Sequence, residues 1–464
     1  LENDAGTYRR ETQWTGPTLL RPETVLPLEL RGLPKGDYTL TVRLSDGRRT
    51  TRRWSKPYDG DPRVALDENN AIRVNGRLFF PVTPYNASTE EEAARWAPYV
   101  NTFFGVGFAP ARHTIAGCRE FLDLAARHGK YAIAPGRGAY WLRGQNGTRL
   151  YPDPENPSGK KLMDRAANPE AIAAYVEALR DHPALLFWDW CDEPDLDNSD
   201  NAIPPAEIRR WTEICHRLDP HHPVYVNLTG KFGRPEDNWG FRHVRTYTLY
   251  GLELPGPDRV PLVDVYSLDI YPIDGQNDPN YEISFETMMR GLRRLRELNG
   301  DLVPVGAFVE TCAIRRDSQL PPPTPAELRL MAWANIVAGA RMISWFHYFN
   351  DTPPENFKEM ARFLDQVTRL TPAVCGPPYG GSITLQLQGG GRIDWTANTA
   401  VEGDGALYLL AVNLKRAPES ATFTLDFEPA KIEVFDENRT LSTAGRAFTD
   451  VFEPLAVHIY RIER

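Results

Sequence analysis

The sequence predicts an α/β protein built on a (β/α)8 barrel, with one β-sandwich before the barrel and another after it. Between about residues 66 and 372, eight short apolar segments of strand length alternate with amphipathic segments of helix length, which is the pattern of parallel βα units. The connections from helix to strand are short, as at 128–130, whereas those from strand to helix are long, as at 229–262. Eight such units favour a closed barrel whose long loops share one rim.

The strands and helices follow from the period of the apolar residues. The strand segments lie at 79–85, 100–107, 131–135, 184–190, 224–228, 263–271, 303–309 and 342–349. The helical segments lie at 113–128, 169–180, 205–218, 285–298, 325–339 and 355–370. The longest loops, at 140–161, 194–205, 229–262, 272–284 and 311–324, are rich in Pro, Gly, Asn and Asp. Loops of that length usually build a functional site.

The two flanking regions show a different pattern, in which polar and apolar residues alternate in short runs between turns. Residues 38–44 alternate in this way before the turn at Asp46-Gly47, and alternation returns at 406–412 and 456–460. Alternation bounded by turn residues is typical of antiparallel sheets. We therefore predict an N-terminal β-sandwich at 1–65, the barrel at 66–375 and a C-terminal β-sandwich at 376–464.

Charge and hydropathy argue against two classes of partner. The chain has 53 Lys and Arg against 62 Asp and Glu, and no basic run stands out, which argues against a nucleic-acid surface. No stretch approaches the roughly 20 consecutive apolar residues of a membrane span. The chain begins with Leu1 rather than Met, so we expect an upstream segment to be missing. A removed export signal would give an extracellular or periplasmic location.

Two glutamates each follow a short apolar strand. Glu193 comes just after the segment 184–190, and Glu310 comes just after 303–309. They are 310 − 193 = 117 residues apart, about three βα units, which places them on the fourth and seventh strands, facing one another across the rim. A glutamate after a strand is often only a helix cap or a solvated charge. The pair together nevertheless predicts the two carboxylates that cleave a glycosidic bond.

The spacing of such a pair decides the chemistry. In a double displacement one carboxylate attacks the anomeric carbon while the other protonates the departing oxygen, so the carboxyl groups must lie roughly 5 to 5.5 Å apart. We predict Glu310 as the nucleophile and Glu193 as the acid/base. This reaction needs no cofactor. The His-x-His clusters that a metal-dependent hydrolase would need at its strand ends are not found, so we predict no metal site.

On these residues the region from about 66 to 372 resembles the clan A glycoside hydrolases. Residues 74–81 resemble the entry to strand one in members that have an N-terminal sandwich, such as the β-galactosidase, β-mannosidase and family 5 types. The resemblance implies the acid/base at Glu193 and the nucleophile at Glu310. It implies that Tyr271, in the segment that begins at Asp269, hydrogen-bonds the nucleophile. It also implies that Trp345 forms the floor of the sugar subsite.

Other residues near the predicted rim are candidates for substrate binding. The clan usually has Asn before the acid/base, whereas this chain has Asp192, whose ionised carboxylate only accepts hydrogen bonds. The arginine of strand two has no clear match, with Arg112 and Arg137 as off-register candidates. Asn227 either binds substrate or caps a loop, and His347 is either a subsite residue or a buried neutral histidine.

These observations predict a retaining glycoside hydrolase that cleaves β-glycosidic bonds of an oligo- or polysaccharide. The alternative is a carbohydrate-binding barrel without catalysis, for which Asp192 is the best argument. The residues do not identify the sugar, the linkage, endo or exo action, the role of the sandwiches or the oligomeric state.

Overall fold

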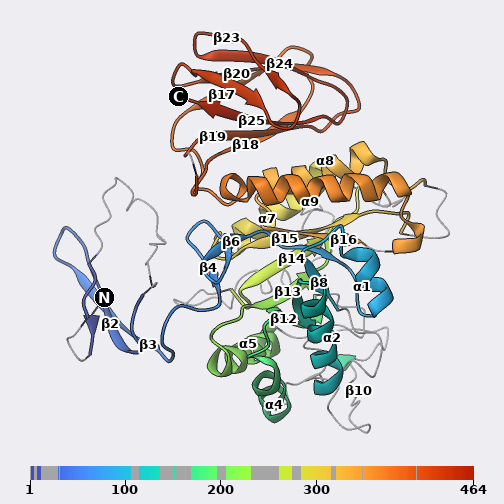
Figure 1. Cartoon of the computed structure of the whole chain (residues 1–464). Helices are drawn as coiled ribbons and strands as arrows, with labels where there is room; N and C mark the ends of the chain where they lie inside the picture. The colour runs from blue at the N-terminus through green and yellow to red at the C-terminus, as the bar shows by residue number, and fades with distance from the viewer. Residues whose placement is uncertain are drawn as a thin grey trace.

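The computed structural model describes residues 2–4, 8–11, 30, 32–105, 114–135, 150–151, 162–163, 169–195, 205–230, 261–273, 284–314, 320–346, 348–403 and 405–464. Figure 1 shows the barrel in the middle of the chain, with separate β structure at either end. The predicted fold class, a (β/α)8 barrel with flanking β structure, is confirmed. Within the described ranges no helix is long and apolar enough to cross a membrane.

Eight parallel strands form the barrel, in the order β7-β16-β15-β14-β13-β12-β9-β8. Their bounds are β7 Val82–Pro84, β8 Thr102–Phe104, β9 Tyr131–Pro135, β12 Leu185–Asp192, β13 Val224–Leu228, β14 Val265–Asp269, β15 Val305–Glu310 and β16 Met342–Phe346. Asn101 closes the barrel between β7 and β8. Its Oδ1 accepts a hydrogen bond from Val82 N at 2.8 Å, and its own N–H donates to Val82 O at 3.1 Å.

Helices follow most of these strands and cover the barrel from outside. They are α1 Glu90–Trp96, α2 Ile115–Arg127, α4 Pro169–Leu179, α5 Pro205–Leu218, α7 Phe285–Leu298, α8 Pro325–Val337 and α9 Pro354–Val374, with a short 3-10 helix η5 at Phe349–Asp351. A capping box begins α8: Thr324 N donates to Glu327 Oε2 at 2.7 Å, and Glu327 N donates to Thr324 Oγ1 at 3.3 Å. The predicted helices left out α1, which is only seven residues long.

The first strand differs from its prediction at 79–85. The structure ends β6 (Arg77–Phe79) before Pro81 and begins β7 at Val82. Proline has no N–H to donate to a sheet, so it separates the two strands. β6 belongs to a small antiparallel sheet with β4 Val64–Leu66 and β5 Ile72–Val74, which spans the predicted boundary at 65. Val64, Ile72 and Val74 pack in one cluster with barrel residues such as Phe104 and Tyr225.

Two further β regions flank the barrel. Near the N-terminus, β1 Glu2–Asn3, β2 Gly36–Arg43 and β3 Arg49–Lys56 form one antiparallel sheet, and β10 Leu150–Tyr151 pairs with β11 Leu162–Met163 in a rim loop. At the C-terminus, one sheet contains β17 Ile383–Leu387, β20 Glu419–Leu425, β23 Thr443–Ala444 and β24 Ala447–Phe452. The other contains β18 Ile393–Thr399, β19 Leu407–Asn413, β21 Lys431–Val434, β22 Arg439–Thr440 and β25 Val457–Glu463. The domain boundaries themselves stay a prediction.

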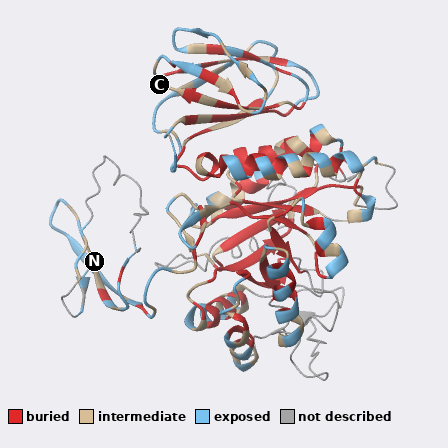
Figure 2. Cartoon of the chain, viewed as in Figure 1, coloured by how far each residue is buried: buried red, intermediate tan, exposed pale blue. Residues whose placement is uncertain are grey.

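The C-terminal sandwich lies against helices α7, α8 and α9 (Figure 1). Arg293 on α7 forms a two-pronged ion pair with Asp394 at 2.8 and 2.9 Å, and Lys415 pairs with Glu286 at 2.8 Å. Figure 2 shows the barrel strands as the most buried part of the chain. Every residue of α8 from Leu330 to Val337 is buried, because the helix lies between the barrel and the sandwich.

Candidate active site

Glu193 stands immediately after β12, where the strand ends in a kink. The register of β12 against β13 shifts between the pairs Asp189–Tyr225 and Asp192–Asn227, which indicates a bulge. Glu193 follows with φ of +47°, a conformation that is uncommon for a residue with a Cβ and costs on the order of 1–3 kcal/mol. Its N–H donates to Asn227 O at 2.9 Å. The backbone therefore gives Glu193 a fixed position at the rim.

A second contact holds this kink in place. Asp195 is buried and accepts two hydrogen bonds from Thr229 N, at 3.0 and 3.2 Å, and one from Thr229 Oγ1 at 2.7 Å. Thr229 directly follows β13. The ends of β12 and β13 are thus joined on both sides of Glu193. Neither Asp195 nor Thr229 was predicted as part of the site.

Asn227, near the end of β13, is at the centre of a buried chain of hydrogen bonds. Its Nδ2 donates to Asp192 Oδ1 at 3.0 Å, and its Oδ1 accepts from Ser267 Oγ at 2.7 Å. The single hydroxyl proton of Ser267 is used in that bond, so the 2.5 Å contact between Ser267 and Tyr225 has the tyrosine as donor. The chain runs from Tyr225 through Ser267 and Asn227 to Asp192. It fixes the amide orientation and makes Asp192 the acceptor.

Glu310 is the last residue of β15 and is fully buried. Its Oε1 accepts a hydrogen bond of 2.6 Å from the backbone N–H of Ile273, which lies beyond β14. In the sheet Glu310 pairs with Phe346 of β16, and the next residue, Thr311, donates its N–H to Phe346 O at 2.7 Å. A backbone donor stabilises the ionised form of a carboxylate, which is the form that a nucleophile needs.

Asp269 and Tyr271 lie between the two glutamates along the rim. Burial raises the pKa of Asp269 well above its usual range, and the negative charges of Glu193 and Asp192 raise it further, against hydrogen bonding from Asn227 and Tyr271 that lowers it. Burial and the charges of Asp269 and Glu193 likewise raise the pKa of Tyr271. Tyr271 therefore keeps its proton. These influences mean that Glu193 lies within electrostatic reach of Tyr271.

The structure therefore brings six of the predicted residues to one rim. Glu193, Asp192 and Asn227 are joined by hydrogen bonds, and Glu193 and Asp192 also act on the charge of Asp269. Tyr271 stands two residues before Ile273, whose N–H holds Glu310. The expected hydrogen bond from Tyr271 to Glu310 is not formed, because the Tyr271 hydroxyl acts on Asp269 instead. His347, Arg112 and Arg137 lie outside the described residues.

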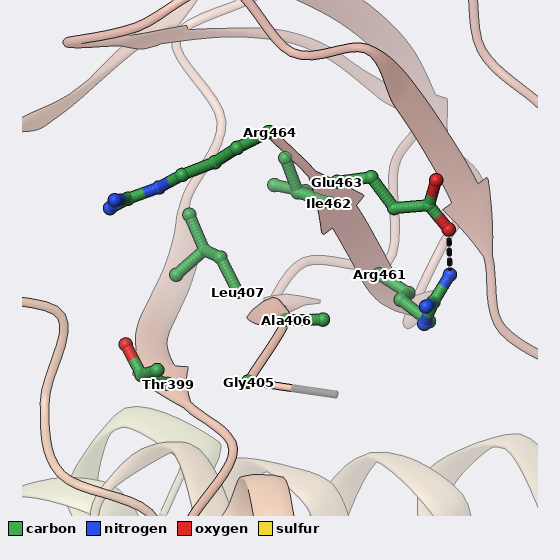
Figure 3. A pocket seen from close by; sticks show the side chains of 8 residues that line it. All are labelled: Thr399, Gly405, Ala406, Leu407, Arg461, Ile462, Glu463 and Arg464. Atoms are coloured by element: carbon green, nitrogen blue, oxygen red, sulfur yellow. Dashed lines mark hydrogen bonds and ion pairs between the residues drawn. The ribbon is translucent and has the colours of Figure 1, made fainter. Parts of the chain in front are cut away.

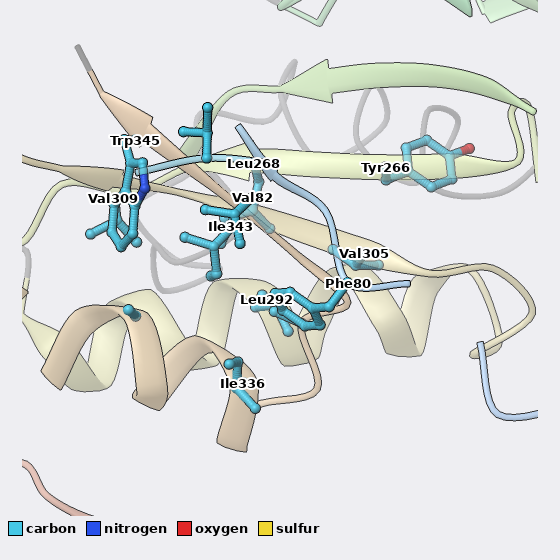
Figure 4. Close-up of a cluster of buried hydrophobic side chains, with 14 of the residues drawn as sticks. Phe80, Val82, Tyr266, Leu268, Leu292, Val305, Val309, Ile336, Ile343 and Trp345 are labelled. Atoms are coloured by element: carbon cyan, nitrogen blue, oxygen red, sulfur yellow. The ribbon is translucent and has the colours of Figure 1, made fainter. Parts of the chain in front are cut away.

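Trp345 is not part of this group. Its side chain is fully buried, its Nε1 donates to Tyr99 O at 3.2 Å, and its ring packs edge-on against Phe363 of α9 with centroids 5.3 Å apart. Figure 4 shows the indole beside Val309 and Ile343, in the cluster between strands and helices. This placement corrects the expected role as the floor of the sugar subsite, because alternate residues of β16 point to opposite sides of the sheet.

Phe346, the next residue, is on the inner side. Its ring stacks on Tyr271 with centroids 4.8 Å apart and meets Tyr85 at 4.7 Å. Only part of Phe346 is buried. Within the described rim, Phe346 is thus the aromatic neighbour of Glu310 in the sheet, and Tyr271 stacks on it. The sequence contains a signal for this arrangement. A serine inside a buried apolar strand indicates the face that lines the barrel, so Ser344 and Phe346 face inward and Trp345 faces outward.

The tryptophans of β12 also belong to the core. The rings of Trp188 and Trp190 stack with centroids 6.1 Å apart, both are buried, and Trp188 Nε1 donates to Asp219 Oδ2 at 2.8 Å. No group of three or more His, Cys, Asp or Glu suited to hold a metal ion is found in the part of the chain that the structure describes.

A pocket lies elsewhere, on the C-terminal sandwich (Figure 3), lined by Thr399, Gly405, Ala406, Leu407, Arg461, Ile462, Glu463 and Arg464. Its one carboxylate, that of Glu463, is ion-paired with Arg461. The pocket therefore lacks the second carboxylate that a glycosidase requires. The barrel rim is the better candidate for an active site.

Comparison with solved structures finds the same barrel architecture in several proteins described as glycosidases. A catalytic mutant of Gan42B, a family GH42 β-galactosidase from G. stearothermophilus, aligns with a TM-score of 0.53 and 10% identity, over 83% of this chain and 98% of that one. Two candidate α-galactosidases from Bacteroides fragilis NCTC 9343 align with TM-scores of 0.51 and 0.52 and identities of 10% and 8%. Each alignment covers 93% of this chain and 86% of the other.

The comparisons by sequence give no match. No protein-family model matches the chain, and no curated protein matches it. At 8–10% identity the structural likeness shows a common fold, a (β/α)8 barrel with flanking β structure, and does not identify a family.

Proposed function

We propose that this protein is a retaining glycoside hydrolase that cleaves β-glycosidic bonds of an oligo- or polysaccharide. One observation carries the proposal: Glu310 ends β15 and Glu193 directly follows β12, at the same rim of one barrel. The backbone N–H of Glu193 is bonded to Asn227 O, and the carboxylate of Glu310 is bonded to Ile273 N. The shared fold with glycosidases supports it. The surrounding groups also fit the chemistry, because Tyr271 is a neutral donor and Phe346 offers an aromatic face beside Glu310.

In the first step a carboxylate oxygen of Glu310 attacks the anomeric carbon of the sugar. The bond from that carbon to the glycosidic oxygen breaks, its electron pair goes to the oxygen, and Glu193 supplies the proton that this oxygen takes up. The product is a glycosyl ester on Glu310. Glu193 is left as a carboxylate.

In the second step a water molecule attacks the same carbon. Glu193 takes a proton from the water, the ester bond breaks, and Glu310 leaves as a carboxylate. Each step inverts the configuration at the anomeric carbon, so the product has the same configuration as the substrate. Ile273 N–H stabilises the Glu310 carboxylate at both ends of the cycle, and the bulge at the end of β12 fixes the backbone position from which the Glu193 side chain acts.

A screen of aryl β-glycosides and β-linked polysaccharides tests the proposal. Wild type, Glu310→Gln, Glu193→Gln and the control Glu355→Gln, on the exposed face of α9, are assayed side by side. The proposal expects product from wild type and the control and almost none from the two site variants. Full activity of either site variant would refute the assignment, and silence of wild type with glycan binding intact would favour the carbohydrate-binding alternative.

A further inference from the structure

Glu193 has a backbone conformation that its local sequence disfavours. Its φ of +47° lies in the left-handed region, which is uncommon for a residue with a Cβ. The next residue is Pro194, and the residue before a proline is pushed towards extended backbone, with φ of about −120°. A conformation that is disfavoured in both ways persists only where the surrounding structure holds it. The contacts around Glu193 therefore decide where its side chain stands.

The kink at Glu193 interrupts the hydrogen-bond ladder between β12 and β13. Glu193 N donates to Asn227 O at 2.9 Å, as in a regular parallel ladder. In an uninterrupted ladder the next bond would run from Thr229 N to Glu193 O, because the bonds of a parallel pair are evenly spaced. Here Thr229 N donates to the carboxylate of Asp195, at 3.0 and 3.2 Å. The Asp195 side chain thus takes the place of a backbone carbonyl in the ladder.

Asp195 and Thr229 together form a buried clasp just beyond the two strands. Thr229 Oγ1 adds a third hydrogen bond, to Asp195 Oδ2 at 2.7 Å, and both residues are buried. The next residue, Gly230, packs against the end of β14. A Cβ at Gly230 would lie 1.8 Å from the backbone oxygen of Asp269, so only glycine fits there. Thr229 is thus held on the side of β14 as well, and is a fixed support for Asp195.

The clasp and the kink depend on one another. With Asp195 as the acceptor, the buried N–H of Thr229 needs no bond to Glu193 O, and the chain can turn at Glu193. Without Asp195 this N–H would lack that acceptor, which is costly inside a protein. It would then favour a regular ladder bond to Glu193 O, which requires the extended backbone that Pro194 also favours. A return to extended backbone would move the Glu193 side chain from its present position.

We propose that Asp195 is a positioning residue for the acid/base. Its clasp with Thr229 keeps Glu193 in the left-handed conformation from which the carboxyl group protonates the glycosidic oxygen. Asp195 itself forms no bond to the substrate. Loss of the clasp removes the proton transfers of Glu193 and leaves the attack by Glu310 intact, because Glu310 is held separately by Ile273 N. The inference rests on the proposed glycosidase function and adds a residue on which the acid/base depends.

The dependence on the leaving group separates this role from a purely structural one. The test uses two aryl β-glycosides of the sugar that the screen identifies: dinitrophenol departs without a proton, whereas phenol needs one. For Asp195→Ala we expect kcat/KM to fall about a hundredfold on the phenyl glycoside and less than about threefold on the dinitrophenyl glycoside, since general acid catalysis contributes on the order of 10²–10⁴. Asp195→Asn keeps an oxygen that accepts from Thr229 N, so both values should stay within about threefold of wild type.

Asp219→Ala is the matched control. Asp219 is also a buried aspartate that holds the chain around it, and it lies between α5 and β13, at the opposite end of the barrel. Its carboxylate has three partners at 2.8 to 3.0 Å, which are Trp188 Nε1, His221 N and His222 Nδ1. Its loss should lower the melting temperature and change kcat/KM for both glycosides by the same factor. A thermal scan of each variant establishes that it is folded at the assay temperature.

The outcomes separate the inference from the proposed function. Equal losses of kcat/KM on the two glycosides in Asp195→Ala, or no loss, would overturn the inference while the glycosidase function stands. If folded wild type cleaves no glycoside, both fail. Should Asp195→Ala not fold, Thr229→Val decides, because it removes the bond from the hydroxyl and should lower kcat/KM about tenfold on the phenyl glycoside alone. A folded Thr229→Val with the wild-type ratio between the two glycosides would then overturn the inference.

Discussion

The backbone N–H of Ile273 donates a 2.6 Å hydrogen bond to Oε1 of Glu310, and thereby joins the ends of β14 and β15 at the rim of the barrel. Because the donor is a backbone N–H, substitution of the Ile273 side chain does not remove it. The N–H also keeps the same direction before and after the reaction. In the proposed mechanism it stabilises the carboxylate that attacks and that later leaves. The proposed nucleophile thus stands at the end of a barrel strand and not within a long loop.

Replacement of Glu310 by Gln is expected to abolish turnover with little effect on folding. The amide keeps the shape and can still accept from Ile273 N, but it is not a nucleophile. We expect kcat to fall by at least about a thousandfold and the melting temperature to stay at or above that of wild type. Steady-state kinetics and a thermal scan of the same sample measure both. A variant that is inactive because it is unfolded would leave the catalytic role without support.

Replacement of Glu193 by Ala should affect the two steps differently. Aryl leaving groups that need no proton still depart, so the glycosyl-enzyme accumulates because no base activates water. We expect a burst of aryl alcohol followed by slow turnover, and acceleration by azide, an anion that attacks without a base. The measurement is burst kinetics with and without azide. Equal loss of activity for all leaving groups, with no effect of azide, would contradict the acid/base role.

The Asp269 carboxyl group is expected to destabilise the fold at neutral pH. Because its pKa is raised in the folded protein, the folded state binds more protons than the unfolded state above the ordinary carboxyl pKa, so stability falls as pH rises through that window. Asp269→Asn should therefore melt at a higher temperature than wild type near pH 7, and the difference should shrink towards pH 4. Thermal scans across pH test this. If Asp269→Asn were less stable than wild type at pH 7, the burial of the Asp269 carboxylate and its repulsion by neighbouring charges would not be the main influence on stability at this position.

The chain from Tyr225 to Asn227 should behave as one unit. Ser267→Ala leaves Tyr225 Oη and Asn227 Oδ1 without their partner, which costs about 1–3 kcal/mol, and it frees the Asn227 amide to turn. Tyr225→Phe should cost less. In the double variant the losses should be smaller than their sum, because both remove the same contact. Denaturant unfolding of wild type, the two single variants and the double variant measures the coupling free energy. If the two losses in the free energy of unfolding add exactly, the hydrogen bonds do not act as one unit.

Substitution of Trp345 should lower the stability of the fold, whereas substitution of its neighbour Phe346 should weaken substrate binding. Trp345→Phe loses the hydrogen bond to Tyr99 O and packing against Phe363, so we expect about 1–3 kcal/mol of destabilisation and an unchanged KM. Phe346→Leu removes the ring that stacks on Tyr271 and should raise KM with a smaller effect on stability. If Trp345→Phe raised KM while Phe346→Leu left KM unchanged, the substrate role predicted for Trp345 would be supported instead.

The sequence predicted the barrel well because its parallel strands are buried on both faces and appear as separate apolar runs. All eight predicted strands correspond to β7, β8, β9, β12, β13, β14, β15 and β16. The error at strand one came from Pro81, which divides an apolar run into two short strands of different sheets. The missed helix α1 is too short to show a clear apolar period.

The candidate site was predicted less completely. A glutamate after a strand is visible in the sequence, so the position of Glu193 and Glu310 at the rim was predicted. The groups that hold these two residues in place are not visible in the sequence. The N–H of Ile273 belongs to a residue without distinctive chemistry, and the φ of Glu193 depends on a bulge in the register of β12. Trp345 was misplaced because the apolar residues of a strand that is buried on both faces do not show which side each one faces. The one polar residue of the strand that indicates the inner face, Ser344, was not used.

The most direct test is to trap the glycosyl-enzyme and locate it. Wild type is incubated with 5-fluoro glycosyl fluorides of gluco and galacto configuration, and is then digested and analysed by mass spectrometry. The account predicts a mass increase of one fluoroglycosyl group on the peptide that contains Glu310, and on Glu310 within it. A label on any other residue, or turnover of these compounds with inversion and no covalent intermediate, would contradict it.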